Sequence, residues 1–171
     1  PWALKMPLGH IVDLIWKHKN YMVYCGALII TLSLLIMYGL IAHTSTMANF
    51  LSVETWFVLS VILTPVGYVI QDVVADAMTV EAVPLEDESG QKLSPKAIKE
   101  MHMTMQTLGR FAIIGGTVFV GLINVILFQG VETLSEKEKI QLYASIYMWA
   151  LIIPLISVLG VFLENNLKNQ R

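Results

Sequence analysis

The sequence predicts an all-α membrane protein, and three observations support this class. The chain has 171 residues, of which 56% are hydrophobic and only 14% are charged, whereas soluble domains have about 25% charged residues. Four runs are almost free of charge and reach the roughly 20 residues that a helix needs to cross a bilayer. Helix-start signals precede three of these runs, and none has the alternating pattern of a strand.

The four predicted spans cover most of the chain. They comprise residues 21–43, 53–82, 104–128 and 141–163. The first and last spans contain no charged residue, and the third is charged only at Arg110. Residues 1–8 are too short to cross a bilayer, so we interpret this stub as the end of an earlier helix. Because the chain opens with Pro1, we expect it to be part of a longer protein.

Capping chemistry marks the ends of these helices. Ser52 is a candidate N-cap for the second span, because its hydroxyl accepts a hydrogen bond from the first helical turn. The pair Ser94-Pro95 places a proline at the first helical position. Residues 135–138, Ser-Glu-Lys-Glu, fit a capping box before the fourth span. Pro154 is expected to kink that span.

Basic residues indicate the orientation in the membrane. The loops at 9–20 and 84–103 and the tail at 164–171 contain seven lysines and arginines, against two in the opposite loops. The cytoplasmic side carries the excess of positive charge in membrane proteins. We therefore expect an integral, multi-pass protein with both loops and the tail in the cytoplasm. The net charge of −2 gives no indication of a nucleic-acid partner.

Three carboxylates interrupt the second span in the stretch VIQDVVADAMTVEAV. Asp72 and Asp76 are four residues apart and share one helix face, whereas Glu81 belongs to another face or to the helix end. A carboxylate at the centre of a membrane helix costs about 2.5–3.5 kcal/mol, so it usually faces a cavity or a partner. Arg110, near the cytoplasmic end of the next span, is the candidate partner. This ion pair either only holds the two helices together or also separates to interact with a substrate or a proton.

A second group of residues lies in PLGHIVDLIWKHK, residues 7–19. Gly9 permits close approach of two helices, and Asp13 can accept hydrogen bonds from a helix N-terminus. Lys17 and Lys19 can pair with Asp13 or with lipid phosphates. The plain alternative is an ordinary cytoplasmic turn with flanking charge.

The spacing of Gly9 and Asp13, followed by basic residues, resembles the loop between helices 2 and 3 of the major facilitator superfamily. Leu14 and Ile15 stand where that motif usually has an arginine. The resemblance implies a conformational gate formed by Gly9, Asp13, Lys17 and Lys19. It also implies that the four spans are helices 3 to 6, so that residues 1–171 are a partial N-terminal six-helix bundle.

Two further stretches resemble the folate–biopterin transporter family of that superfamily. DVVADAMTVEA carries the family's D-x-x-x-D-A-x-x-x-E pattern, and MQTLGRFAIIGG approximates the start of its helix 5, with the arginine spacing one residue short. The resemblance implies secondary active transport of folate, pterin or a related small anionic metabolite by alternating access, with proton coupling as one option. It makes Asp72, Asp76 and Arg110 the substrate- or proton-coupling residues and Glu81 a carboxylate at the helix end.

Two other classes of protein remain open. Asp72 and Asp76 are spaced to hold one divalent metal ion, as in membrane transferases of the CDP-alcohol type, but the upstream half of that motif is missing. A non-transporting four-helix scaffold is the other. We predict a transporter rather than an enzyme, with no cofactor and no bound metal. Its expected partners are the lipid bilayer, a small-molecule substrate and the remaining helices of the full-length chain.

The glycines of the third span predict a packing face. Gly115, Gly116 and Gly121 lie in a run without proline. Small residues let membrane helices approach closely, so we expect another helix to pack against this part of the span.

Overall fold

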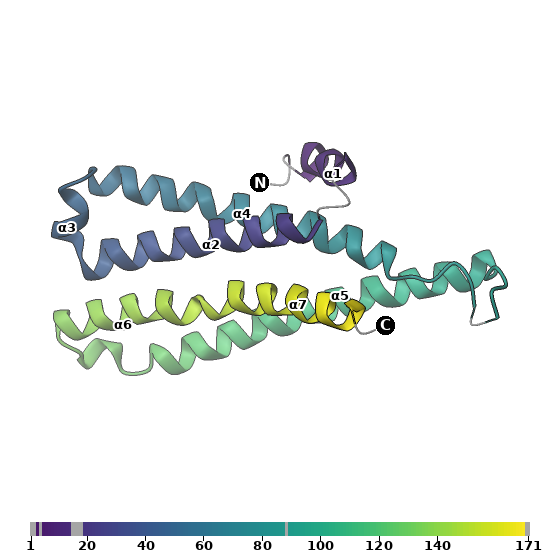
Figure 1. The fold of residues 1–171 in the computed structure, drawn as a ribbon. Helices are drawn as coiled ribbons and strands as arrows, with labels where there is room; N and C mark the ends of the chain where they lie inside the picture. Colours follow the sequence, from purple (N-terminus) through teal and green to yellow (C-terminus); the bar gives the residue numbers. More distant parts are fainter. Residues whose placement is uncertain (1–2, 4, 15–18, 88, 170–171) are drawn as a thin grey trace. The chain divides into compact units, whose positions relative to one another are not determined.

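Helices form nearly all of the described chain. The computed structural model describes residues 3, 5–14, 19–87 and 89–169. The helices are α1 (Lys5–Leu14), α2 (Lys19–Ala42), α3 (Thr44–Ala48), α4 (Val53–Glu81), α5 (Pro95–Leu127), the 3-10 helix η3 (Val131–Thr133), α6 (Glu136–Ala150) and α7 (Ile152–Asn169) (Figure 1). No strand is formed within these residues, so the predicted all-α class is confirmed.

Four helical stretches within the described ranges have the length and hydropathy of membrane spans. They are Lys19–Ala42, Val53–Glu81, Pro95–Thr133 and Glu136–Leu163. Each corresponds to one of the spans predicted from the sequence. The third is longer than predicted because α5 begins at Pro95, inside the loop expected at residues 84–103.

The N-terminal segment differs from the prediction. We expected a stub that ends at residue 8 and a loop over 9–20, whereas α1 continues to Leu14 and places Gly9 and Asp13 on a helix. Pro7 lies in the first turn of α1, where a missing N–H removes no intrahelical hydrogen bond. Val12 is buried to 1% exposure, so one face of α1 is packed.

The predicted caps are confirmed. Ser52 Oγ accepts a hydrogen bond of 3.2 Å from the backbone N–H of Thr55. Ser94 Oγ accepts one from Ala97, also at 3.2 Å. The side chain of Ser135 and the carboxylate of Glu138 form a reciprocal capping box at the start of α6. These bonds satisfy backbone donors that a helix start leaves without partners.

The fourth span is interrupted at Leu151, between α6 and α7. Pro154 has no N–H to donate to the carbonyl of Ala150, four residues earlier. At the interruption, the N–H of Leu151 bonds to the carbonyl of Met148, three residues earlier, at 3.2 Å. A regular α-helix would use the carbonyl four residues earlier. A proline does not always have this effect, because Pro65 lies inside the continuous helix α4.

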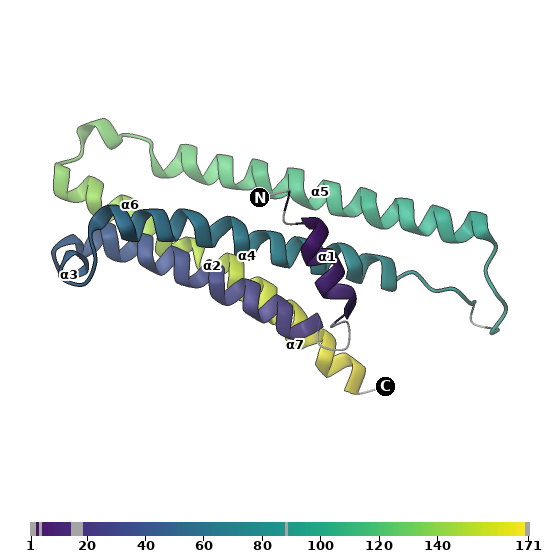
Figure 2. The same ribbon diagram turned by 90° about the horizontal axis from the view of Figure 1, so that it is seen from above.

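Contacts divide the chain into two compact units, Pro1–Val74 with Thr133–Arg171, and Ala75–Glu132. In the first unit α2 packs against α6 and α7. The first part of α4 runs beside α2 in both views (Figures 1 and 2). The buried side chains are mostly aliphatic, among them Ala27 and Ile36 of α2, Val69 and Val73 of α4, and Ala144 of α6.

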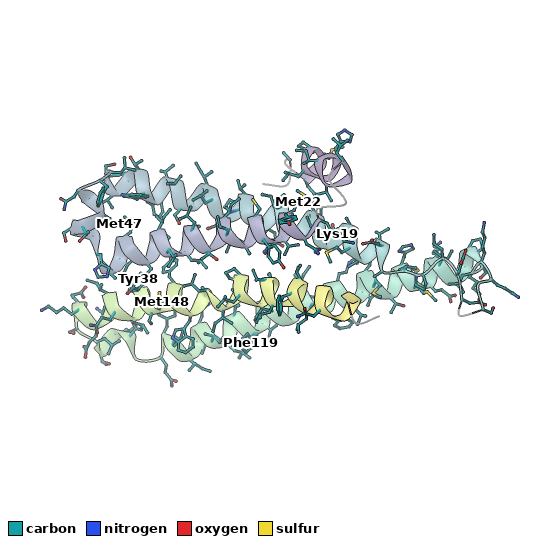
Figure 3. All side chains as sticks on the ribbon, in the orientation of Figure 1. Lys19, Met22, Tyr38, Met47, Phe119 and Met148 are labelled. Atoms are coloured by element: carbon teal, nitrogen blue, oxygen red, sulfur yellow. The ribbon has the colours of Figure 1, made fainter. Side chains whose placement is uncertain are left out.

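The segment at residues 43–52, which connects α2 to α4, contacts both helices. Trp56 Nε1 donates a hydrogen bond of 3.1 Å to the carbonyl of Met47. The sulfur of Met47 would lie 3.3 Å from a Cβ added at Gly39. Figure 3 shows Tyr38 and Met47 at one end of the pair formed by α2 and α4, and Lys19 and Met22 at the other end.

In the second unit, residues 85–87 pair with residues 91–93 just before α5, through a bond of 2.9 Å from the N–H of Leu93 to the carbonyl of Leu85. Asp87 Oδ1 accepts hydrogen bonds from the N–H groups of Ser89 and Gln91, both at 2.9 Å. Gly90 has φ +77°, a conformation that favours glycine. The bond from the Ser89 hydroxyl, followed by that from Gln91, lowers the pKa of Asp87.

The helix α5 itself has no buried residue among those described. Its exposed side chains are mainly apolar, and they include Phe111, Ile114, Val118 and Val125. A Cβ added at Gly115, Gly116 or Gly121 would meet no atom within 4 Å. Within the second unit no described residue approaches these three glycines, and the close packing predicted for them stays a prediction.

Candidate functional site

Asp72 pairs with a lysine that the sequence did not single out. Lys5 Nζ lies 2.8 Å from Asp72 Oδ2, and the two side chains are 33% and 19% exposed. Lys5 is the first residue of α1, and Asp72 lies about 28 Å along α4 from Val53 at 1.5 Å per residue. A signal was present in the sequence, because the predicted topology places the end of the stub and the end of the second span on the same side of the membrane.

The neighbours of Asp72 fix this part of α4. Gln71 Nε2 donates a hydrogen bond of 3.3 Å to the carbonyl of Val23 on α2. Val73 and Val74 are buried to 6% and 0% exposure. The backbone of Asp72 is thus held between packed residues, and its carboxylate lies at the edge of the buried face.

The pair lowers the cost of charge among apolar helices. A single ionised group at membrane depth is expensive, and an ion pair at hydrogen-bond distance offsets part of that cost. Removing one member leaves the other as a partly buried charge without this ion pair, which costs more than replacing both members by neutral side chains.

The other two carboxylates of α4 lie in the second unit and are exposed. The backbone carbonyl of Asp76 accepts a hydrogen bond of 2.6 Å from Thr79 Oγ1. Glu81 is the last residue of α4, as expected for a carboxylate at the helix end.

Arg110 lies on α5 with its side chain exposed. The ion pairs between described residues are Lys5–Asp72 and Lys139–Glu136. The expected pair between Arg110 and Asp76, which belong to the same unit, is thus not formed there. A pair between Arg110 and Asp72 would join the two units and stays a prediction, although Lys5 already neutralises that carboxylate.

The gate motif is only partly described. Gly9 lies on α1, and a Cβ added there would meet nothing within 4 Å, so the close approach expected at this glycine is not found among the described residues. Lys19 is the first residue of α2. Lys17 and the side chain of Asp13 lie outside the described residues.

Two glycines that the sequence pattern did not reveal, Gly26 and Gly67, set the distance between α2 and α4. A Cβ on Gly67 would lie 2.8 Å from Ile30 Cγ1 and 2.9 Å from the carbonyl oxygen of Gly26. A Cβ on Gly26 would lie 2.7 Å from Gln71 Cγ. Because each glycine is on a different helix, no local pattern such as G-x-x-x-G reveals them.

Three hydroxyls join the same helices half-way along. Ser33 Oγ donates to the carbonyl of Ser60 at 2.8 Å, and Ser60 Oγ donates to the carbonyl of Ser33 at 3.0 Å. Thr64 Oγ1 also bonds to Ser33 Oγ. Ser33 and Ser60 are 1% and 2% exposed. We call Gly26, Gly67 and these three hydroxyl residues the α2–α4 seam.

Replacing the seam serines is expected to destabilise the protein non-additively. Ser33→Ala or Ser60→Ala removes one of two reciprocal donors and should each cost about 0.6–1.7 kcal/mol. The double variant should lose less than the sum, because the two hydroxyls also bond to each other at 2.9 Å and either single variant already removes that bond. Thermal unfolding in detergent measures this. Ser157→Ala is the control, since Ser157 bonds only weakly to its own helix, at 3.5 Å. Additive losses would contradict a shared network.

Within the residues described, no group of three histidine, cysteine or acidic side chains is placed to hold a metal ion. No protein-family model, curated protein or solved structure significantly matches the chain.

Proposed function

We propose that the chain is part of the N-terminal bundle of a secondary active transporter. Its substrate is folate, a pterin or a related small anionic metabolite, and it works by alternating access. The motifs around Asp72 and Arg110 that resemble the folate–biopterin transporter family supply the substrate class. Charged side chains on otherwise apolar helices are the second line of support.

The observation that carries the proposal is the partly exposed ion pair between Lys5 and Asp72. Ionisable groups are rare at membrane depth and generally mark substrate, ion or proton pathways. A pair that served packing alone would be replaced by apolar side chains at little cost or with a gain in stability. Arg110 adds a second cation on an otherwise uncharged stretch of α5, which suits an anionic substrate.

The α2–α4 seam is a rigid element in the proposed transport cycle. Glycine contacts and reciprocal serine bonds join α2 to α4 along much of their length, so these helices move together. Alternating access then requires motion of this helical pair relative to other helices of the full-length protein. Asp72 is attached to the moving pair and is the candidate for proton coupling.

A metal-dependent transferase is less well supported. In such an enzyme Asp72 and Asp76 would hold one divalent cation between them. Here Asp72 Oδ2 accepts a hydrogen bond from the ammonium group of Lys5, which would compete with a metal ion for the same oxygen. The closely packed seam is also what a non-transporting scaffold requires, so the scaffold is the second candidate.

Uptake into vesicles tests the proposal. Vesicles that carry the full-length protein should accumulate labelled folate or a labelled pterin faster than vesicles without protein. A pH gradient should change the rate if a proton is coupled. Vesicles that accumulate none of these compounds under either condition would contradict the proposed function and favour the scaffold.

A further inference from the structure

One face of α4 carries a tyrosine and a carboxylate that are one helical turn apart. Tyr68 and Asp72 are at positions i and i+4, so their side chains leave the helix on the same face, with about 5–6 Å between their Cβ atoms. Tyr68 is 49% exposed, and the side chain of Asp72 is 19% exposed. Both residues belong to the first unit. An aromatic ring and a hydrogen-bond acceptor are therefore accessible next to each other.

Both side chains can take a further partner. Lys5 donates to Oδ2 of Asp72, whereas Oδ1 accepts no hydrogen bond within the described part of the first unit. A carboxylate has about four lone-pair sites, so it accepts more donors while the ion pair with Lys5 stays in place. Tyr68 forms no hydrogen bond or ring contact with the described residues of that unit. Its ring is thus accessible to a planar ligand.

The pterin ring has the complementary pattern of groups. On one edge, the N3–H and the 2-amino group donate two parallel hydrogen bonds, and a carboxylate accepts such a pair with its two oxygens, as it does from arginine. The flat face of the ring stacks on an aromatic side chain. A carboxylate next to an aromatic ring therefore matches both the edge and the face of a pterin.

We propose that Asp72 and Tyr68 bind the pterin head group of the substrate, with Asp72 at the ring edge and Tyr68 against the ring face. The inference rests on the proposed function and deepens it, because it assigns one part of the substrate to two side chains. Lys5 remains paired with Asp72 throughout and holds the carboxylate in place. A simple pterin without an acidic tail binds at this site as well.

The inference makes Asp72 the residue that distinguishes a 2-amino group from a 2-oxo group. Lumazine is pterin with an oxygen in place of the 2-amino group, so it presents an acceptor where Asp72 needs a donor. We expect the unmodified protein to bind pterin at least about tenfold more tightly than lumazine. Asp72→Asn introduces an amide that donates to the 2-oxo group and accepts from N3–H, so this variant should bind lumazine more tightly than pterin.

The experiment measures equilibrium binding of pterin and of lumazine to the full-length protein in vesicles. Tyr68→Leu should weaken both ligands about fivefold, because stacking depends little on the ring substituents. Tyr68→Phe keeps the ring and should leave both affinities within about twofold. Phe57→Leu is the matched control and should change neither affinity, since Phe57 is 50% exposed on the same helix, about 17 Å from Tyr68 at 1.5 Å per residue.

The outcomes separate the inference from the proposed function. If the full-length protein neither transports nor binds folate or a pterin, both fail. If it transports a pterin but binds pterin and lumazine equally, only the inference fails. The inference also fails if Asp72→Asn weakens both ligands by the same factor, as a purely structural role predicts, or if Tyr68→Leu binds both ligands unchanged.

A second variant covers the case in which Asp72→Asn does not fold. Lys5→Met combined with Asp72→Asn removes both charges of the pair, and the same preference for lumazine is expected there. If neither variant folds, the unmodified protein and Tyr68→Leu decide, because both keep the ion pair. The inference then requires the preference of the unmodified protein for pterin together with weaker binding of both ligands by Tyr68→Leu, and it fails if either result is missing.

Discussion

Gly67→Ala is expected to destabilise the protein by about 1–3 kcal/mol, the usual cost of overpacking a close contact. The added Cβ would lie 2.9 Å from the carbonyl oxygen of Gly26 and 2.8 Å from Ile30 Cγ1. The side chain of Ile30 has other rotamers, but a backbone carbonyl moves only if the two helices separate. Separation would also stretch the serine bonds of the seam and the bond from Gln71 to Val23.

Thermal unfolding of the purified protein in detergent measures this effect. Gly116→Ala on α5 is a matched control, because a Cβ there meets nothing within 4 Å. That substitution should be neutral or stabilising by up to about 1 kcal/mol, the gain in helix propensity from glycine to alanine. Equal melting temperatures for the two variants would show that α2 and α4 are not in close contact at Gly67.

Arg110→Ala is expected to reduce uptake of an anionic substrate about 10- to 150-fold, if the proposed function is right. Hydrogen bonds to charged groups contribute about 1.5–3 kcal/mol, and each 1.4 kcal/mol corresponds to a factor of ten. Arg110 is exposed and forms no ion pair with the described residues of its own unit, so no carboxylate of that unit neutralises its charge. The initial rate of uptake, normalised to the amount of protein in the vesicles, measures the loss.

Two controls sharpen this measurement. Arg110→Lys keeps the positive charge and should retain part of the activity, although it loses the planar geometry that binds a carboxylate at two points. Lys137→Gln removes an exposed positive charge near the start of α6 and should have little effect. Full uptake by Arg110→Ala would assign this arginine a structural role.

Local features of the fold were predictable from the sequence. The capping box at Ser135 and Glu138 depends on residues three apart, so its pattern is visible in the chain. The four long helices follow from hydropathy alone. The break near Pro154 follows from a missing N–H four residues after Ala150. Each of these predictions needs no knowledge of which helices are neighbours.

The site was harder to predict because its contacts join distant residues. Lys5 and Asp72 are 67 positions apart, and Arg110 was an equally plausible partner by depth in the membrane. Gly26 and Gly67 look ordinary within their own helices. Their importance depends on the rotation of α2 against α4, which hydropathy does not determine. The three glycines of α5 formed a more conspicuous pattern, yet they have no close neighbour among the described residues.

The interruption at Leu151 has a consequence for the way the last span crosses the membrane. Helix α6 has 15 residues and α7 has 18, which at 1.5 Å per residue gives rods of about 22 and 27 Å. Neither rod alone reaches across a hydrocarbon core of about 30 Å. In a chain that crosses the bilayer with this span, the joint between the two rods lies inside the hydrocarbon core, and α2 contacts both α6 and α7. A change of angle at this joint would alter the tilt of one half of the span and leave the hydrogen bonds within the other half in place.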